Sequence, residues 1–301
     1  MPAVIKRSLY FSKAVYLRKR HNQLEALLNH SLVTSAPIED LGFVILDHPQ
    51  IQYSQSLLIA LIENNTAVIY CDAKHMPTAV LLNLSSHHLQ QELHRTQIQV
   101  KIPAKKALWK SIVEYKIRNQ IGTVKSLGLP VPPALQRTAR EVKSGDTSNR
   151  EAVAAKLYWQ AIMPKGYTRN NPELLANKLL NYGYTILRSA VARALTGSGL
   201  LPTVGIHHRN QYNSFALADD IMEPYRPFVD KEVVSLCAAN SMCGGTELSR
   251  EHKKALLEIL AMDVYWPNKK RPLANGLSLT TASLARYFAD RSEAVIFPSV
   301  G

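Results

Sequence analysis

The residues best suited to chemistry lie in one stretch, residues 205–226, which reads GIHHRNQYNSFALADDIMEPYR. The stretch contains two adjacent histidines and, further on, the carboxylates Asp219, Asp220 and Glu223. From residue 213 the apolar residues recur at helical spacing, so Asp220 and Glu223 share one helix face, as do Asp219 and Glu223. Carboxylates crowded on one face repel one another unless a cation lies between them.

An imidazole nitrogen together with carboxylate oxygens suits Mg²⁺ or Mn²⁺, with open positions for phosphate or water. The stretch therefore predicts a divalent-metal site. A second interpretation fits the same spacing, because a D-D-x-x-E pattern on a helix is often only a solvated face and paired histidines are common in loops.

The composition favours a partner that carries negative charge. The chain has 301 residues, with 36 Lys and Arg against 23 Asp and Glu, which gives a formal net charge of +13. Such a balance is typical of proteins that bind nucleic acid, although a generally basic soluble protein would show it too. The charge alone therefore favours, without requiring, a nucleic-acid partner.

The three cysteines, Cys71, Cys237 and Cys243, form neither a C-x-x-C pair nor a zinc-binding spacing, which indicates free thiols in a reducing compartment. The first ten residues lack the apolar core of a signal peptide, and no run reaches the length of a membrane span. We therefore expect a cytoplasmic protein that does not enter a membrane.

The hydrophobic pattern divides the chain near residue 86. Residues 1–86 contain short alternating segments typical of strands, with one helical segment at residues 54–64. Residues 87–301 follow the helical period almost to the end, where residues 293–301 look like a tail. We expect a small β-rich domain followed by a larger helical domain.

Residues 104–127 predict one long basic helix, in which Trp109 lies among lysines that include Lys110 and Lys116. Basic residues interleaved with aromatics can bind a phosphate backbone and stack on bases. Alternatively, the aromatics belong to the core and the lysines are merely solvated. We expect the core position for Trp109 and Ile112, and the lysines stay open.

A further helix begins after a polar loop at residues 144–149, with Asn149 or Ser148 as the expected N-cap. Glu151 lies in the first turn of this helix, where the helix dipole favours a carboxylate, so a structural role would also explain it. Lys156 follows on the same helix. Another basic group, residues 269–271, is expected in a loop.

Four motifs occur together in a fixed order: E-x-x-A-A-K-x-Y at residues 151–158, N-x-x-L-N-Y-G-Y at residues 177–184, G-x-x-H at residues 205–208 and D-x-M-E-P-Y-R at residues 220–226. In this combination the chain resembles the CRISPR-associated integrases, the metal-dependent nucleases that install new spacers in most CRISPR systems. The segments LGFVILDHPQI and AVIYCDAKHMP of the β-rich start resemble the variant found beside the single-protein, RNA-guided effector of type II systems.

The resemblance implies an α+β multi-domain fold. A small N-terminal β-sandwich-like domain, residues 1–86, would dimerise, and a larger all-α domain, residues 87–301, would be catalytic. By motif, the metal ligands and catalytic residues would be Glu151, His208 and Glu223, with His207 the poorer candidate. Asp220 would lie behind these ligands or serve as an alternate one.

The resemblance also implies an activity that uses Mg²⁺ or Mn²⁺. A 3′-hydroxyl of spacer DNA would attack a phosphodiester of the CRISPR array, and water in its place would give endonuclease activity. The implied partners are double-stranded DNA (spacer precursor and repeat), a second copy of the chain, a small companion protein bridging two dimers, and the type II effector nuclease.

The candidate DNA contacts are Lys156, Arg226, Lys110 and Lys116, although Lys156 and Arg226 can equally form salt bridges with nearby acids. Two other functions fit parts of the sequence. A DNA-binding scaffold without its own catalysis is opposed by the full set of ligands. A metal-dependent phosphodiesterase acting on RNA or small phosphodiesters also fits the site, but small substrates do not need a charge of +13.

Overall fold

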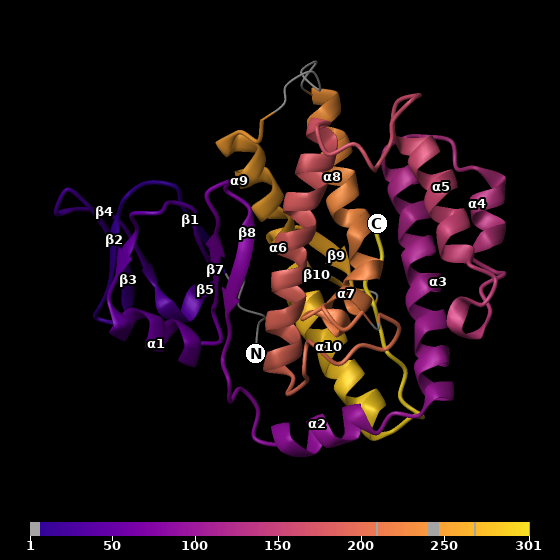
Figure 1. Cartoon of the computed structure of the whole chain (residues 1–301), viewed down its shortest axis with the longest axis horizontal. Helices are drawn as coiled ribbons and strands as arrows, with labels where there is room; N and C mark the ends of the chain where they lie inside the picture. The colour runs from indigo at the N-terminus through magenta and orange to yellow at the C-terminus, as the bar shows by residue number, and fades with distance from the viewer. Residues whose placement is uncertain (1–6, 209, 240–246, 268, 301) are drawn as a thin grey trace. The chain divides into compact units, whose positions relative to one another are not determined.

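The structure is a computed structural model that describes residues 7–208, 210–239, 247–267 and 269–300. The chain divides into two compact units, Met1–His88 and Leu89–Gly301 (Figure 1). Strands build the first unit and helices the second, which confirms the expected α+β multi-domain class. The first unit ends at residue 88, where the sequence pattern had placed the boundary at 86.

Two four-stranded sheets make up the N-terminal unit, with strand orders β1-β5-β7-β8 and β4-β3-β2-β6. Helix α1, Gln55–Glu63, contributes to the same apolar core as both sheets, as expected for a β-sandwich-like unit. The central strand β5, LGFVIL, is buried along its whole length, which suits its parallel pairing on both sides. The strands are β1 Arg7–Phe11, β2 Tyr16–Arg20, β3 Gln23–Leu28, β4 Ser31–Pro37, β5 Leu41–Leu46, β6 Gln52–Tyr53, β7 Ala67–Cys71 and β8 Pro77–Leu81.

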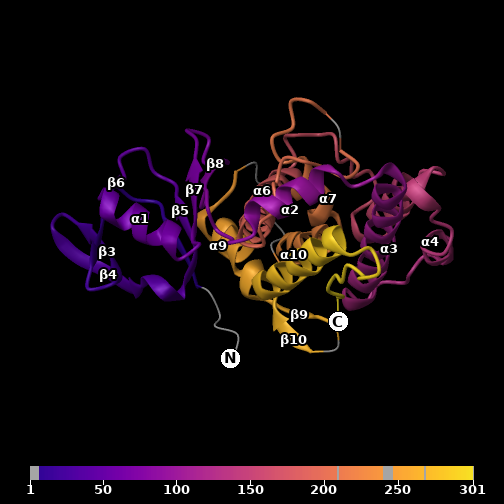
Figure 2. The same ribbon diagram turned by 90° about the horizontal axis from the view of Figure 1, so that it is seen from below.

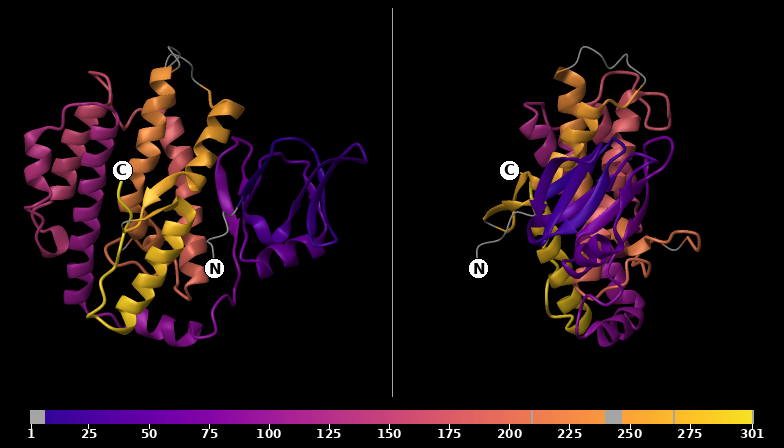
Figure 3. Two further views of the ribbon diagram at one scale, coloured as in Figure 1. Left: turned by 180° about the vertical axis from the view of Figure 1, so that it is seen from behind. Right: turned by 90° about the vertical axis from the view of Figure 1, so that its left-hand side faces the viewer.

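Nine α-helices occur in the described part of the C-terminal unit. Helix α6 is its centre, because most of its residues are buried and α7, α8, α9 and α10 all pack against it (Figure 3). No described helix is long and apolar enough to cross a membrane. The helices are α2 Gln90–Ile98, α3 Ile102–Ser126, α4 Pro133–Thr138, α5 Arg150–Ile162, α6 Leu175–Gly197, α7 Ala216–Met222, α8 Arg226–Ala239, α9 Arg250–Glu258 and α10 Leu273–Ala289.

The glycine of the N-Y-G-Y motif lets two central helices approach closely. A Cβ added at Gly183 in α6 would lie 2.5 Å from Val229 Cγ1 in α8, a distance that real Cβ atoms do not reach. A larger residue at position 183 would therefore push α8 away from α6.

Two expectations for the C-terminal residues are wrong. Residues 295–300 are no free tail, because the side chain of Asn119 in α3 donates to Pro298 O at 3.0 Å and accepts from Val300 N at 3.2 Å. The basic group at residues 269–271 is not confined to a loop either. Lys270–Pro272 form strand β10, which pairs with β9, Asp263–Tyr265, beside α10 (Figure 2).

A buried carboxylate ties three helices together. Asp230 of α8 accepts hydrogen bonds from Tyr158 of α5, at 3.0 Å, and from Tyr184 of α6. Burial raises the pKa of Asp230 to about 7, against the opposing effects of these two hydrogen bonds and of Arg226. Asp230 therefore keeps a proton over a pH range in which ordinary aspartates have lost theirs.

We expect Asp230→Asn to remove a pH dependence of stability. An aspartate in the unfolded chain titrates at about pH 4, so between about pH 4 and 7 the folded state holds a proton that the unfolded state has lost. The contribution of Asp230 to the free energy of unfolding therefore falls as the pH rises through this window, on the order of 4 kcal/mol in total. Thermal unfolding of both forms across the window measures this change.

The control for this experiment is Asp263→Asn, at an exposed position of β9. As the pH rises, the free energy of unfolding of the Asp230→Asn variant should increase relative to that of the unmodified protein. The corresponding difference for Asp263→Asn should not change with pH. A constant difference for Asp230→Asn would show that Asp230 is ionised throughout the window.

Candidate active site

Glu151 is placed by a carboxylate that caps its helix. Asp146 accepts from the backbone N–H groups of Arg150, at 2.8 Å, and Glu151, at 2.9 Å, and so satisfies two free donors at the start of α5. The expected caps are wrong, because Asn149 adopts a left-handed conformation and makes no side-chain cap bond. Asp146 therefore fixes the first turn from which Glu151 projects.

Asp220 organises the loop that carries both histidines. Its buried carboxylate accepts from the backbone N–H groups of Ile206, His207 and His208, at 2.5, 3.0 and 3.2 Å. The loop passes so close that a Cβ at Gly205 would lie 2.6 Å from His208 O and 3.2 Å from Asp220 Oδ2. This contact explains why a glycine precedes the histidine by three positions and why an aspartate follows it.

The two histidine rings face different neighbours. His208 Nδ1 lies 2.6 Å from Asp220 Oδ1, and this hydrogen bond, followed by the nearby charges of Asp220 and Glu223, raises the pKa of His208. His207 instead stacks on the buried Trp109 of α3, with ring centroids 4.0 Å apart and ring planes 2° from parallel. Only His208 is thus held by a carboxylate in the way that metal-binding histidines usually are.

Glu223 is buried where α7 meets the short helix Glu223–Tyr225. Its Oε1 accepts from Arg226 Nε at 2.8 Å, and Arg226 in turn stacks over the ring of Tyr184 at 4.5 Å. Burial acts to raise the pKa of Glu223, but Arg226 and Lys116 together hold it well below its ordinary value. Glu223 is therefore an ionised carboxylate inside the protein.

A lysine joins the two glutamates. Lys116 Nζ of α3 lies 2.6 Å from Glu151 Oε1 and 2.6 Å from Glu223 Oε2, with only 12% of its side chain exposed. Glu223 Oε2 has this charged neighbour but no hydrogen bond of good geometry. Burial acts to lower the pKa of Lys116, but the two carboxylates raise it, so the ammonium stays charged. Two carboxylates thus converge on one cation position.

These residues fit a divalent cation in two respects. Glu151 and Glu223 present oxygens to one point, and the Nδ1 of His208 is already engaged by Asp220, which leaves Nε2 for a metal. The His208 imidazole, however, does not lie next to the two glutamates. Within the described ranges, no group of three His, Cys, Asp or Glu side chains lies close enough together to hold a metal ion.

Asp219 serves a different purpose from its neighbour. It accepts from Arg188 Nε of α6 at 2.7 Å and from Asn213 Nδ2 at 2.8 Å. These contacts anchor the polar loop to α6. Asp219 thus stabilises the segment that carries His208.

The four candidate DNA contacts divide into two pairs. Lys156 lies at an exposed position, and Lys110 is partly exposed and forms a 3.7 Å ion pair with Glu114, one turn away. Lys116 and Arg226 instead pair with the buried Glu223. The structure therefore gives Lys116 and Arg226 partners inside the protein, while contact with DNA stays a prediction for Lys110 and Lys156.

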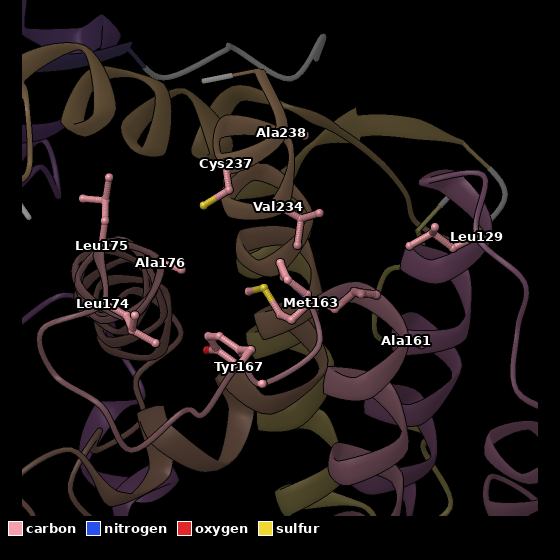
Figure 4. A pocket seen from close by; sticks show the side chains of 13 residues that line it. Leu129, Ala161, Met163, Tyr167, Leu174, Leu175, Ala176, Val234, Cys237 and Ala238 are labelled. Atoms are coloured by element: carbon pink, nitrogen blue, oxygen red, sulfur yellow. The ribbon is translucent and has the colours of Figure 1, made fainter. Parts of the chain in front are cut away.

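The cavities near this region differ in the chemistry of their linings. A cavity of about 200 Å³ is lined by Lys116, Gln120, Tyr184, Glu223 and Asp230 among others. A larger one, about 600 Å³, lies between the ends of α5, α6 and α8 and is lined by residues such as Met163, Leu174 and Val234 (Figure 4). The larger cavity has no acidic, basic or imidazole side chain in its lining, so its size does not mark the site.

Two of the three cysteines lie among the described residues. Cys71 and Cys237 form no disulfide, and Cys243 lies outside the described residues. Sequence reasoning missed Asp146 and the ion-pairing role of Lys116. The position of Asp146 four residues before a helix start is a weak signal for a cap, and no local pattern links Lys116 to Glu223.

Comparison with known proteins identifies the family. The family model described as CRISPR associated protein Cas1 matches residues 9–259. The CRISPR-associated endonuclease Cas1 of Neisseria meningitidis serogroup C (strain 8013) is 39% identical over 231 residues, which cover 76% of this chain and 75% of that protein. A CRISPR-associated endonuclease Cas1 of Francisella tularensis subsp. novicida (strain U112) is 26% identical over 66% of this chain and 69% of its own length.

Solved structures share the fold. A casposase bound to integration product matches with a TM-score of 0.76 at 18% identity, covering 96% of this chain and 92% of that one. A CAS1 protein from Thermotoga maritima matches with a TM-score of 0.73 at 16% identity, covering 96% and 99%. Together with the match of the family model to most of its length, this shows that the chain belongs to the Cas1 family of CRISPR-associated proteins.

Proposed function

We propose that this chain is a metal-dependent DNA integrase and endonuclease that inserts spacer DNA into a CRISPR array. The observation that supports this most is the convergence of Glu151 and Glu223 on one cation position, beside a histidine held by Asp220. The endonuclease name of its relatives and the casposase bound to integration product point to the same chemistry.

Glu151, Glu223 and Nε2 of His208 would hold the Mg²⁺ or Mn²⁺ ion. When bound, such an ion supplies Lewis-acid polarisation of a DNA phosphate and stabilises charge on the leaving oxygen. His208 reaches the two glutamates only if its ring or the loop at residues 205–208 shifts, and Asp220 keeps the Nδ1 proton in place during that shift.

The other residues of the site position and balance charge. Arg226 neutralises the inner oxygen of Glu223 and is itself fixed by the ring of Tyr184. The 3′-hydroxyl of the spacer would lose its proton to solvent and attack the phosphorus in line, so that one P–O ester bond forms as the P–O bond to the leaving oxygen breaks. The leaving oxygen would take a proton from solvent. Positioning supplies most of the rate in such a reaction, because the protein forms no covalent bond with the DNA.

The proposed partners follow the family. Double-stranded DNA supplies spacer precursor and repeat, and two copies of the chain form a homodimer through their N-terminal units. A small companion protein bridges two dimers, and the type II effector nuclease is a further proposed partner. Solved chains of similar fold come from a Cas6-RT-Cas1–Cas2 complex and from a Cas1–DNA complex of TtCas1, which supports the DNA and companion partners.

A plasmid integration assay tests the site. The substrates are short duplex DNA with 3′-hydroxyl ends and a repeat-containing plasmid, with Mn²⁺ or Mg²⁺ and the companion protein. We expect Glu151→Gln, Glu223→Gln and His208→Ala each to lower the rate of joining by at least about 100-fold, because each removes a metal ligand. Asp220→Asn should lower it about 10- to 100-fold through the orientation of His208.

The matched control is His207→Ala, which removes the adjacent imidazole that stacks on Trp109. It should retain joining within about threefold after correction for folded protein. Loss of joining in His207→Ala but not in His208→Ala would reverse the assignment of the histidines. Tight DNA binding without joining by the unmodified protein would favour the scaffold function, and efficient cleavage of RNA alone would favour the RNA phosphodiesterase.

Binding of duplex DNA should weaken steeply with salt. A basic surface that contacts phosphates releases counterions, and each lost contact reduces the slope of log affinity against log salt by about one. We expect Lys110→Gln and Lys156→Gln each to reduce this slope, measured by fluorescence anisotropy between about 50 and 200 mM salt. The exposed Lys19→Gln in β2 is the control, and equal slopes in all variants would contradict the assignment.

A further inference from the structure

The charges around the proposed metal site already balance without a metal. Glu151 and Glu223 carry two negative charges, and Lys116 and Arg226, their ion-pair partners, carry two positive ones. A divalent cation that entered with Lys116 in place would meet an ammonium at the point on which both carboxylates converge. A cation that occupies that point has to leave it first, since like charges at this distance repel strongly.

Lys116 is the residue that can leave. Arg226 is fixed by two contacts, the hydrogen bond to Glu223 Oε1 and the ring of Tyr184. Lys116 contacts the two glutamates through a single ammonium at the end of a flexible side chain. Its ammonium occupies the space between the carboxylates, and Arg226 binds Glu223 through the opposite oxygen.

The polar cavity beside Lys116 offers a second position. Lys116 and Gln120 both line it and lie one helical turn apart on α3, so their side chains share one face. Gln120 is only 3% exposed, and its Oε1 is buried without a hydrogen-bond partner. An unsatisfied buried acceptor is costly, and an ammonium is the donor that would satisfy it best.

We propose that Lys116 is a two-position residue: its ammonium bridges Glu151 and Glu223 when no metal is bound, and a divalent cation displaces it onto Gln120 in the adjacent cavity. The inference rests on the proposed metal site and deepens it. Lys116 neutralises the carboxylates before the metal arrives and, as a competitor, lowers the affinity of the site for the metal. Gln120 favours the displaced state and so raises that affinity.

The test is a double-mutant cycle on Mn²⁺ affinity, measured by isothermal titration calorimetry without DNA. Lys116→Met removes the competitor and should tighten Mn²⁺ binding about tenfold or more. Gln120→Leu removes the second partner of the ammonium and should weaken binding about tenfold when Lys116 is present. In the Lys116→Met background, Gln120→Leu should change the affinity by less than about twofold, because no ammonium needs the acceptor.

The control variant is Gln136→Leu, the same substitution at an exposed position of α4, which should leave Mn²⁺ binding unchanged. Gln120→Met, of similar volume, repeats the result with a different side chain, and thermal unfolding in EDTA verifies that each variant is folded. An unchanged affinity in Gln120→Leu, or equal weakening in both backgrounds, would overturn the two-position role and leave the metal site intact. Absence of Mn²⁺ binding in the unmodified protein would overturn the metal site itself.

Discussion

A buried carboxylate, Glu223, and a partly exposed one, Glu151, share one cation, and this interaction sets the arrangement of the C-terminal unit. Glu151 comes from α5 and Glu223 from the end of α7, and the side chain of Lys116 from α3 meets both at 2.6 Å. Leaving Glu223 buried and unpaired would cost several kcal/mol, so α3 and the segment that carries Glu223 have to stay together. Glu151 pairs with the same ammonium, which brings the start of α5 to this point.

Two further carboxylates, each close in sequence to the residue that it holds, support this centre. Asp146 fixes the first turn of α5, and Asp220 gathers the loop at residues 205–208 through three backbone hydrogen bonds. Each carboxylate satisfies backbone donors that would otherwise be free. The side chains that would perform chemistry, Glu151 and His208, are therefore held by carboxylates that would not touch the DNA.

A second layer of packing keeps the helices at the required spacing. Gly183 permits the close approach of α6 to α8, and Asp230 joins α8 to Tyr158 and Tyr184. Tyr184 also supports Arg226, which binds Glu223, so the helix packing and the charge balance are physically connected. Gly183, Asp230 and Tyr184 thus influence the proposed site, although they lie one or two contacts away from it.

Local periodicity was sufficient for the α+β class, the change from strands to helices near residue 86 and most of the helices. Motif order, through the family resemblance, proposed Glu151, His208 and Glu223 as site candidates. The partners of Glu151 and Glu223 were decided by tertiary structure. By sequence, Lys116 is one of several lysines on a basic helix, and residues 293–301 look like a tail. No local pattern indicates that Lys116 contacts Glu223 or that Asn119 binds Pro298 and Val300. Contacts of this kind arise only when burial brings distant segments together and every charge and backbone group among them needs a partner.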